Sequence, residues 1–250
     1  MIDAHCHLQE FENPGEAISG LEAVVCCGSG VKSSQKAVEL ASKYKEVFAT
    51  VGVHPEEREE IKRLSDEETK KLFLKLYNHK KVVAIGECGL DTGSDEEMEL
   101  FKFNIELAKE TKLPLVVHCR NQFEKVFQVL SARGQGLSVQ MHCFTGGMEQ
   151  MRECVKRGWY ISLGGIVTFK SSHGLREVAK EIPEDKLLIE TDSPYLAPEP
   201  IRGTRNMPIN VKIVAAKIAE VRSTSINQIE KITSENCRRL FLRLMTTNKN

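Results

Sequence analysis

The sequence lacks the features that mark several large classes of protein. No apolar run approaches ~20 residues, so we expect no transmembrane helix. Basic charge is not in excess, because 35 lysines and arginines balance 35 aspartates and glutamates. A protein that coats nucleic acid non-specifically is usually basic, so any contact with nucleic acid should be local. The eight cysteines include no CxxC pair, which excludes a zinc-knuckle arrangement.

Two further features concern the cell compartment. The chain enters an apolar, strand-like run at its first residues, which leaves no place for a signal peptide. A chain with this many thiols suits a reducing compartment. We therefore expect a cytoplasmic protein with no membrane contact, and the sequence indicates no obligatory protein partner.

Short apolar runs alternate with segments of helical period along the whole chain. The expected strands are Met1–His7, Ala23–Gly28, Val47–His54, Val82–Cys88, Leu115–Cys119, Val139–Phe144, Tyr160–Gly164 and Leu187–Thr191. The expected helices are Ser33–Tyr44, Ser65–His79, Ser94–Thr111, Asn121–Ala132, Glu149–Arg157, Leu175–Ile182, Asn210–Val221 and Ser225–Leu244. Two of these helices, those at Ser65 and Ser94, begin with a capping-box spacing.

This alternation predicts an α/β protein with a parallel sheet. A (β/α)8 TIM barrel needs ~250 residues, so residues 1–250 fit one barrel as a single domain. An open dinucleotide-binding sheet would place a glycine-rich loop after the first strand. Histidines occupy that position here, which favours the barrel.

The first strand ends in two histidines, His5 and His7, separated by one residue. Side chains alternate along a strand, so both imidazoles should face the same side. Two imidazoles that face one point supply half of a transition-metal site. Alone, a buried histidine is more often a hydrogen-bonded core residue, but the pair favours metal binding.

Other polar residues with suitable ligand atoms end later strand-like runs. They are Glu87, His118, His142 and Asp192. The active sites of barrels lie at the C-terminal ends of the strands, so all six side chains should converge there. Six ligands exceed the number that one zinc ion takes, which indicates two divalent ions, Zn, Mg, Mn or Co. Glu87 would bridge the ions, and Asp192 would orient or deprotonate an attacking water.

Simpler roles exist for some of these residues. Glu87 lies between two glycines and would also suit a structural acid at a turn, and Asp192 would also suit a cap of the next element. His54, at the end of the third strand, is expected to face substrate. Arginines that follow strands are the candidates for phosphate binding, because a guanidinium binds phosphate through two parallel hydrogen bonds. They are Arg120, Arg202 and Arg205.

Several motifs carry a family resemblance. They read DAHCHL from Asp3, VGVHP from Val51, IGECGLD from Ile85, HCFTG from His142, GGIVTF from Gly164, ETDSPYLAP from Glu190 and RGTRN from Arg202. In this order and spacing the chain resembles the TatD-type deoxyribonucleases of the amidohydrolase superfamily. The resemblance implies a metal-dependent barrel, with His5, His7, Glu87, His118, His142 and Asp192 as metal ligands and Glu190 close to the metals.

The sequence departs from this pattern after Asp91. Many relatives continue with tyrosine and then a basic residue, whereas this chain reads TGS from Thr92. That change removes an aromatic ring and a cation with which a base or a phosphate would interact. It leaves the metal ligands in place and bears on the choice of substrate.

The resemblance implies a hydrolase that cleaves phosphodiester bonds of DNA. The expected activity is 3′-to-5′ exonuclease action on single strands through a metal-activated water at a binuclear centre, with Asp192 and Glu87 as catalytic residues. An alternative keeps the metal chemistry and changes the bond to a carboxylic ester or amide, such as an aminoacyl-tRNA ester or a lactone. A third is a non-catalytic metal-binding or scaffold role.

Overall fold

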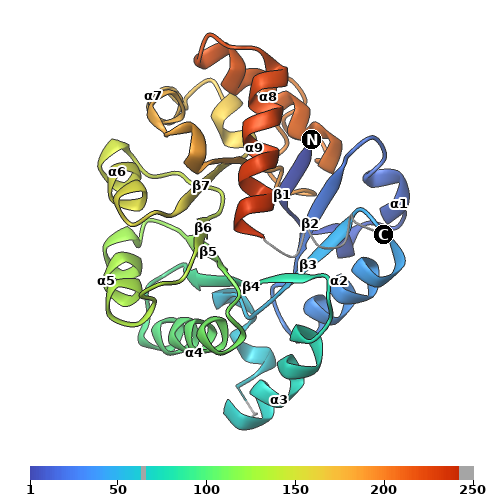
Figure 1. Ribbon diagram of the computed structural model, residues 1–250, viewed down its shortest axis with the longest axis vertical. Helices are drawn as coiled ribbons and strands as arrows, with labels where there is room; N and C mark the ends of the chain where they lie inside the picture. Colours follow the sequence, from blue (N-terminus) through green and yellow to red (C-terminus); the bar gives the residue numbers. More distant parts are fainter. Residues whose placement is uncertain (63–65, 242–250) are drawn as a thin grey trace. The chain divides into compact units, whose positions relative to one another are not determined.

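The computed structural model describes residues 1–62 and 66–241. Eight strands form one sheet in which neighbours follow the order of the chain from β1 to β8 (Figure 1). The strands are β1 (Ile2–Cys6), β2 (Ala23–Cys27), β3 (Val47–Val51), β4 (Val82–Leu90), β5 (Leu115–Cys119), β6 (Val139–Met141), β7 (Tyr160–Leu163) and β8 (Leu187–Ile189). With a helix after most strands, this order is that of a (β/α)8 barrel, as the sequence predicts.

The described chain divides into two compact units. The first unit comprises Met1–Val25 and Met141–Leu240, and the second comprises Cys26–Gln140 together with Phe241. Strands β2 and β6 each contain a boundary between the units. The two units are each considered by themselves below.

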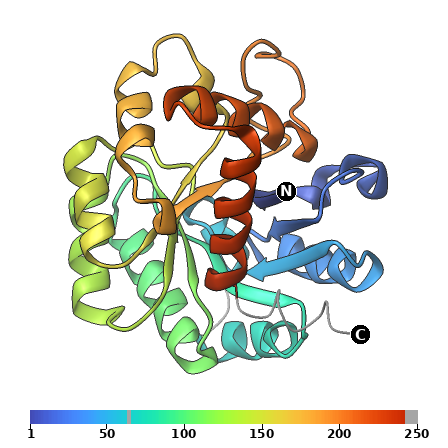
Figure 2. The same cartoon turned by 45° about the horizontal axis from the view of Figure 1, so that its top comes forward.

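The first unit contains both ends of the strand order. The backbone N–H of His7 donates to the carbonyl of Ser193 at 2.7 Å, and Cys6 pairs with Ser193 as a parallel bridge. This pairing joins β1 to the segment that follows β8. The helices of the unit are α1 (Pro14–Ala17), α6 (Met148–Lys156), α7 (His173–Glu181), α8 (Val211–Val221) and α9 (Ile226–Leu240), and Figure 2 shows α8 and α9 side by side.

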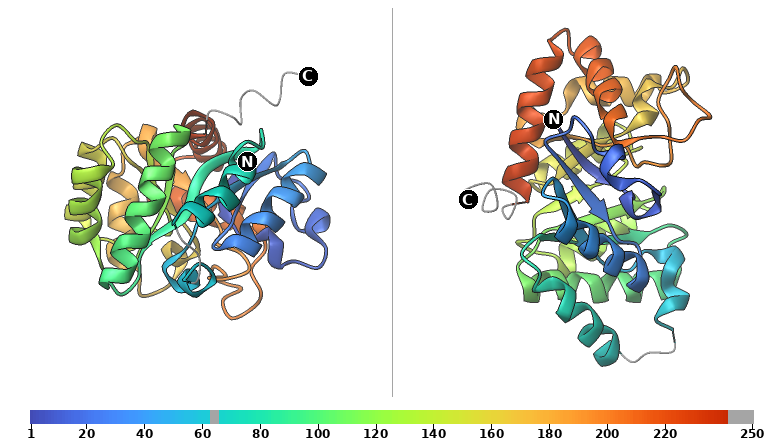
Figure 3. Two further views of the ribbon diagram at one scale, coloured as in Figure 1. Left: turned by 90° about the horizontal axis from the view of Figure 1, so that it is seen from below. Right: turned by 90° about the vertical axis from the view of Figure 1, so that its right-hand side faces the viewer.

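The second unit is built on β3, β4 and β5, which pair in parallel. Its helices are α2 (Val31–Lys43), α3 (Asp66–Tyr77), α4 (Asp95–Thr111) and α5 (Phe123–Arg133), and Figure 3 shows α4 beside α5. Short 3₁₀ turns occur in both units, and one of them, η2 (Pro55–Glu60), follows β3. No helix in the described ranges is long and apolar enough to span a membrane.

Local sequence explains most of these elements. All nine residues of β4 are buried, and its run of β-branched residues suits a strand that is covered on both faces. Helix α4 begins where the Ser94 hydroxyl accepts the Glu97 N–H, as its capping-box spacing predicts. The starting residue expected for the third helix, Ser65, and the last residue expected for the final helix, Leu244, lie outside the described residues.

The structure changes some expected boundaries. Strand β4 runs on to Leu90, so Glu87 lies inside the strand and not at its end. The pairing of β4 with β5 shifts between Ile85 and Cys88, which places an irregularity beside Glu87. The short helix α1 was not expected from the helical period, because it has only four residues.

Candidate metal-binding clusters

The first unit gathers five side chains with potential metal-ligand atoms, which we call the first cluster: His5, His7, His142, Glu190 and Asp192. Strand β1 contains His5, His7 lies just beyond its last residue, Cys6, and His142 directly follows β6. The Nε2 atoms of His5 and His7 lie 3.5 and 3.4 Å from Oδ1 of Asp192. Both imidazoles thus face one carboxylate, although the first strand ends at Cys6 and not at His7 as expected.

A second carboxylate in this cluster orients a histidine. Oε1 of Glu190 lies 3.0 Å from Nδ1 of His142 and accepts the Cys143 N–H at 2.7 Å. A proton on Nδ1 then leaves Nε2 of His142 as the ligand nitrogen. The His142 ring also stacks on that of His5, with centroids 3.8 Å apart. Glu190 is completely buried, so this orientation is held away from water.

A buried aspartate braces the backbone behind the cluster. Asp3 accepts hydrogen bonds from the Thr191 hydroxyl at 2.6 Å, from the Thr191 N–H at 2.9 Å and from the His5 N–H at 3.3 Å. These contacts tie β1 to the segment after β8, which is where His5 and Asp192 lie. Burial raises the pKa of Asp3 well above its ordinary value.

Asp192 has an uncommon backbone and an acidic side chain. Its φ of +56° lies in the left-handed region, which aspartate tolerates better than most residues. Burial acts to raise the pKa of Asp192, but the hydrogen bond from His7 and the charges of His142 and His5 outweigh it and lower the pKa. The side chain is thus an ionised carboxylate at neutral pH and is able to accept a proton.

The second unit contains another group, which we call the second cluster: His54, Glu87, Asp91 and His118. Nε2 of His54 and Nδ1 of His118 lie 3.6 and 3.5 Å from the same oxygen of Glu87. The two rings meet edge to face, with centroids 4.5 Å apart. Strands β4 and β5 supply Glu87 and His118, and His54 precedes η2.

Hydrogen bonds assign the protons in this second cluster. Nδ1 of His54 accepts the Glu56 N–H at 3.2 Å, so its proton lies on Nε2, which faces Glu87. Nε2 of His118 lies 3.1 Å from Oδ1 of Asp91, which leaves Nδ1 as its ligand nitrogen. Glu87 and His118 are therefore the candidate metal ligands of this cluster, and Nε2 of His54 faces Glu87 at 3.6 Å.

Two glycines allow Glu87 to lie against β5. Gly86 and Gly89 have φ of +143° and +138°. A Cβ at Gly86 would lie 2.6 Å from the Val116 carbonyl oxygen, and one at Gly89 would lie 2.0 Å from that of His118. No larger residue fits at either position. The glycine pair around Glu87 therefore has a close-packing role beside the candidate ligand.

The loop between β4 and α4 is held by one carboxylate. Glu97, which is 1% exposed, accepts the N–H groups of Asp91, Thr92 and Gly93 at 2.8–3.2 Å and the Thr92 hydroxyl at 2.7 Å. Burial acts to raise the pKa of Glu97, but these hydrogen bonds outweigh it and lower the pKa. Thr92 and Gly93 of the TGS segment that departs from the family pattern thus direct their N–H groups to Glu97.

Three arginines were predicted to bind phosphate, and they have different surroundings. Nε of Arg120 lies 3.1 Å from Oδ1 of Asp91. Arg205 donates to the Glu10 carbonyl at 2.6 Å and lies over the Phe11 ring. The Arg202 guanidinium lies 4.2 Å from the centroid of the Phe169 ring, and it has no polar partner within the described ranges. Arg202 is thus the arginine with the most available N–H groups.

The donor atoms suit a divalent metal ion in both clusters. Ligand atoms of His5, His142 and Glu190 lie within 4.8 Å of one another, as do those of His54, Glu87 and His118. Neutral imidazole with carboxylate is a donor set that Zn²⁺, Mn²⁺ and Co²⁺ take. Such an ion, when bound, acts as a Lewis acid and makes coordinated water more acidic.

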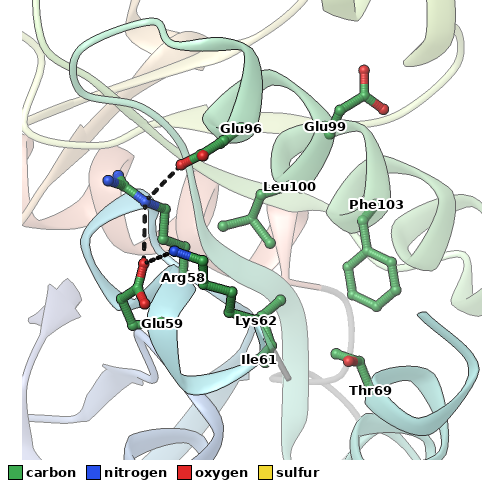
Figure 4. Close-up of a pocket in the computed structure, with 9 residues that line it drawn as sticks. All are labelled: Arg58, Glu59, Ile61, Lys62, Thr69, Glu96, Glu99, Leu100 and Phe103. Atoms are coloured by element: carbon green, nitrogen blue, oxygen red, sulfur yellow. Dashed lines mark hydrogen bonds and ion pairs between the residues drawn. The ribbon is translucent and has the colours of Figure 1, made fainter. Parts of the chain in front are cut away.

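A separate pocket of about 350 Å³ lies in the second unit beside α4 (Figure 4). Arg58 lies 3.2 Å from Glu96, and Lys62 lies 3.0 Å from Glu59, so the charged groups at its rim are paired. Its floor includes Leu100. None of the predicted site residues lines this pocket, which gives it no part in the metal chemistry.

Sequence reasoning gave no role to Asp91, which orients His118. It placed Glu190 near the metals only through the family resemblance. A usable signal exists for Glu190, because it precedes Asp192 by two residues, the spacing that links His5 and His7. For Asp91 no such signal exists, since its contact depends on the turn that Glu97 holds.

Comparisons with known proteins agree with this fold. The pattern of the family described as TatD related DNase matches residues 2–242. An uncharacterized metal-dependent hydrolase of Bacillus subtilis, YabD, is 40% identical over 96% of this chain and 98% of its own length. The 3′-5′ ssDNA/RNA exonuclease TatD of Salmonella typhimurium is 33% identical over 89% and 88% of the two chains.

Solved structures give the same result. The crystal structure of YJJV, a TatD homolog from Escherichia coli, matches with a TM-score of 0.86 and 25% identity over 97% of this chain and 98% of that one. The fold and the two clusters define a metal-dependent hydrolase of the barrel class. Within that class, the chain belongs to the TatD related DNase family.

Proposed function

We propose that this protein removes nucleotides from the 3′ end of single-stranded DNA by metal-dependent hydrolysis of phosphodiester bonds. The observation that carries the proposal is the pair of histidine–carboxylate clusters, each with one histidine oriented by a carboxylate. The similarity to relatives named as 3′-5′ ssDNA/RNA exonucleases supports this substrate class.

Each cluster would hold one divalent ion. In the first cluster the ligands would be His5, His7, His142 and Asp192, and in the second they would be Glu87 and His118. The prediction that Glu87 bridges two ions in a binuclear centre stays a prediction. His54 is proposed to act as a donor toward Glu87 or toward substrate, in keeping with its proton on Nε2.

Other side chains would transfer the proton and bind the phosphate. Asp192, whose pKa is lowered, would accept the proton of the attacking water. Arg202 would donate to a phosphate oxygen, because among the described residues its guanidinium has a ring contact and no polar partner. Arg205 and Arg120 remain candidates for phosphate binding, although each already has a partner within the protein.

The test uses protein that has been stripped of metal and then resupplied with Mg²⁺, Mn²⁺, Zn²⁺ or Co²⁺. Single-stranded DNA labelled at its 5′ end should give a ladder that shortens from the 3′ end only when metal is present. Asp192→Asn, purified in parallel, is the control for contaminating nucleases. An RNA strand and a duplex of the same sequence define the preference among nucleic acids.

One outcome would overturn the proposal. If protein that demonstrably holds metal leaves every form of DNA and RNA intact, the phosphodiester assignment is wrong. A panel of carboxylic esters, lactones and amides then tests the alternative reaction. That alternative has some support in the β4–α4 loop, whose N–H groups bind Glu97 and are not available to a phosphate.

A further inference from the structure

An exposed aromatic ring lies beside the first cluster. Tyr195 follows β8 and is 51% exposed, although large apolar side chains are usually buried. Its ring centroid lies 5.7 Å from that of His7, and the rings meet at 67°. An aromatic side chain therefore borders the candidate metal ligands and presents much of its surface to solvent. The loop that carries it connects β8 to α8 (Figure 2).

The position of this ring is set by hydrogen bonds at both ends of the residue. The Tyr195 hydroxyl donates to the Glu10 carboxylate, with distances of 2.8 and 2.9 Å to its two oxygens. The Tyr195 N–H donates to the Asp192 carbonyl at 2.9 Å. Its own carbonyl accepts from the buried Asn206 side chain at 2.8 Å. The ring is thus held without being buried.

Glu10 is itself held in place. Its N–H donates to the His7 carbonyl at 3.0 Å, and its carbonyl accepts from Arg205 at 2.6 Å. The Arg205 guanidinium also lies over the ring of Phe11. The brace for Tyr195 therefore starts one turn after His7, so the ring and the metal ligand share a rigid support.

A ring that only packed the loop would be covered by it. Instead, the Tyr195 hydroxyl donates to Glu10, and 51% of the residue stays exposed. The exposed ring surface is what remains for a ligand. A fixed aromatic face binds a nucleobase at small entropic cost, because little freedom is left to lose.

We propose that Tyr195 is a stacking platform for the nucleobase at the 3′ end of the strand, braced by Glu10 and Arg205. The inference rests on the proposed exonuclease function and adds to it a residue that positions substrate by base stacking. Every base has a flat aromatic face that stacks, so Tyr195 would favour a strand with an intact 3′-terminal base whatever that base is.

The binding test uses a single strand with 2-aminopurine at its 3′ end, whose fluorescence falls when the base stacks. The protein is the Asp192→Asn variant, whose metal content is measured first and which should bind without cutting. We expect quenching that disappears when Tyr195→Ala is added, with affinity about tenfold weaker or more, the scale of one base–aromatic stack. Tyr195→Phe should retain most of the quenching, because it keeps the ring and loses only the contact with Glu10.

Two controls separate stacking from a general effect on the loop. The first is an otherwise identical strand with an abasic 3′ terminus, on which Tyr195→Ala should make no difference. The second is Ile226→Ala, which removes another exposed apolar side chain in the same unit and should leave quenching unchanged. In the cleavage assay, Tyr195→Ala should raise KM for intact termini and change kcat little.

The inference is overturned if the protein binds the strand without quenching. It is also overturned if Tyr195→Ala lowers the affinity for strands with intact and with abasic 3′ termini by the same factor. The second result would show a role in loop packing alone. These outcomes differ from failure of the proposed function, in which the metal-loaded wild-type protein cuts no DNA at all. If cleavage occurs but does not depend on the terminal base, the proposed nuclease function stands and the stacking role of Tyr195 is rejected.

Discussion

The two units each contain a histidine oriented by a carboxylate, but in different surroundings. In the first unit Glu190 holds His142, and both side chains are almost completely buried. In the second unit Asp91 holds His118, and their side chains are 14% and 16% exposed. Asp91 also pairs with Arg120, whose side chain is 63% exposed. The Glu190–His142 pair is therefore closed to water, whereas the Asp91–His118 pair is partly exposed to it.

This difference separates two ways to position a metal ligand. A buried pair is not screened by water, so its electrostatic contribution is large and its loss leaves an unsatisfied group. A partly exposed pair is screened more and depends on its loop, which here is held by Glu97. We therefore expect the first cluster to be the tighter site and the second to be the more easily adjusted one.

The largest effect is expected from Asp192→Asn in the first cluster. Asparagine also tolerates a positive φ, so the backbone should persist while the proton acceptor is lost. Loss of a general base lowers kcat by about 10²- to 10⁴-fold. Initial rates on single-stranded DNA, together with the thermal midpoint, would check this. A rate close to wild type would assign proton transfer to another group.

The next effect concerns the closed pair. Glu190→Ala should weaken metal binding at the first cluster by about 100-fold, the upper end of the range for a group that orients a ligating histidine. Competition of the protein with a chromophoric chelator gives the affinity directly. His173→Ala, which changes an exposed histidine in the same unit, is the matched control and should leave the affinity unchanged. Unchanged affinity in Glu190→Ala would contradict the orienting role.

The open pair should respond less. Asp91→Ala should weaken metal binding at the second cluster by about tenfold, the lower end of the same range. Arg120→Ala should change the affinity less than Asp91→Ala does, because a solvent-exposed ion pair contributes at most about 1 kcal/mol. Titration calorimetry on the two variants would rank them. If Arg120→Ala lowered the metal affinity more than Asp91→Ala does, Arg120 would hold the loop more strongly than its exposure indicates.

The smallest effect on chemistry should come from the support of that loop. Glu97→Gln should lower the free energy of unfolding at neutral pH by about 1–3 kcal/mol, the cost of leaving buried donors poorly paired. The pKa of Glu97 is lowered below its ordinary value of 4.5, so its contribution is present above that pH and is lost as the pH falls through the folded pKa. Urea unfolding at several pH values should show the two proteins converging in acid. A constant difference would contradict the charge-dependent account.

The barrel and the main ligand candidates followed from local patterns. Alternation along Met1–His7 placed two imidazoles on one side, and the structure brings both to Asp192. The strand expected at Val82–Cys88 was found, but β4 continues to Leu90, since glycines at two positions allow close pairing with β5. Hydrophobic periodicity indicates which residues are buried, but it does not indicate where a strand stops pairing with the neighbouring strand.

The orienting contacts depended on tertiary structure. Asp3 meets Thr191 across 188 residues, and Glu190 meets His142 across 48. No local pattern specifies such pairs, because hydrogen bonds between distant segments form only when the fold places them together. The same holds for Tyr195, whose exposure and contact with Glu10 distinguish a braced surface ring from a packed one. The sequence by itself determined the fold class and the metal-binding residue types; tertiary structure decided the proton on each ring and the partner of each arginine.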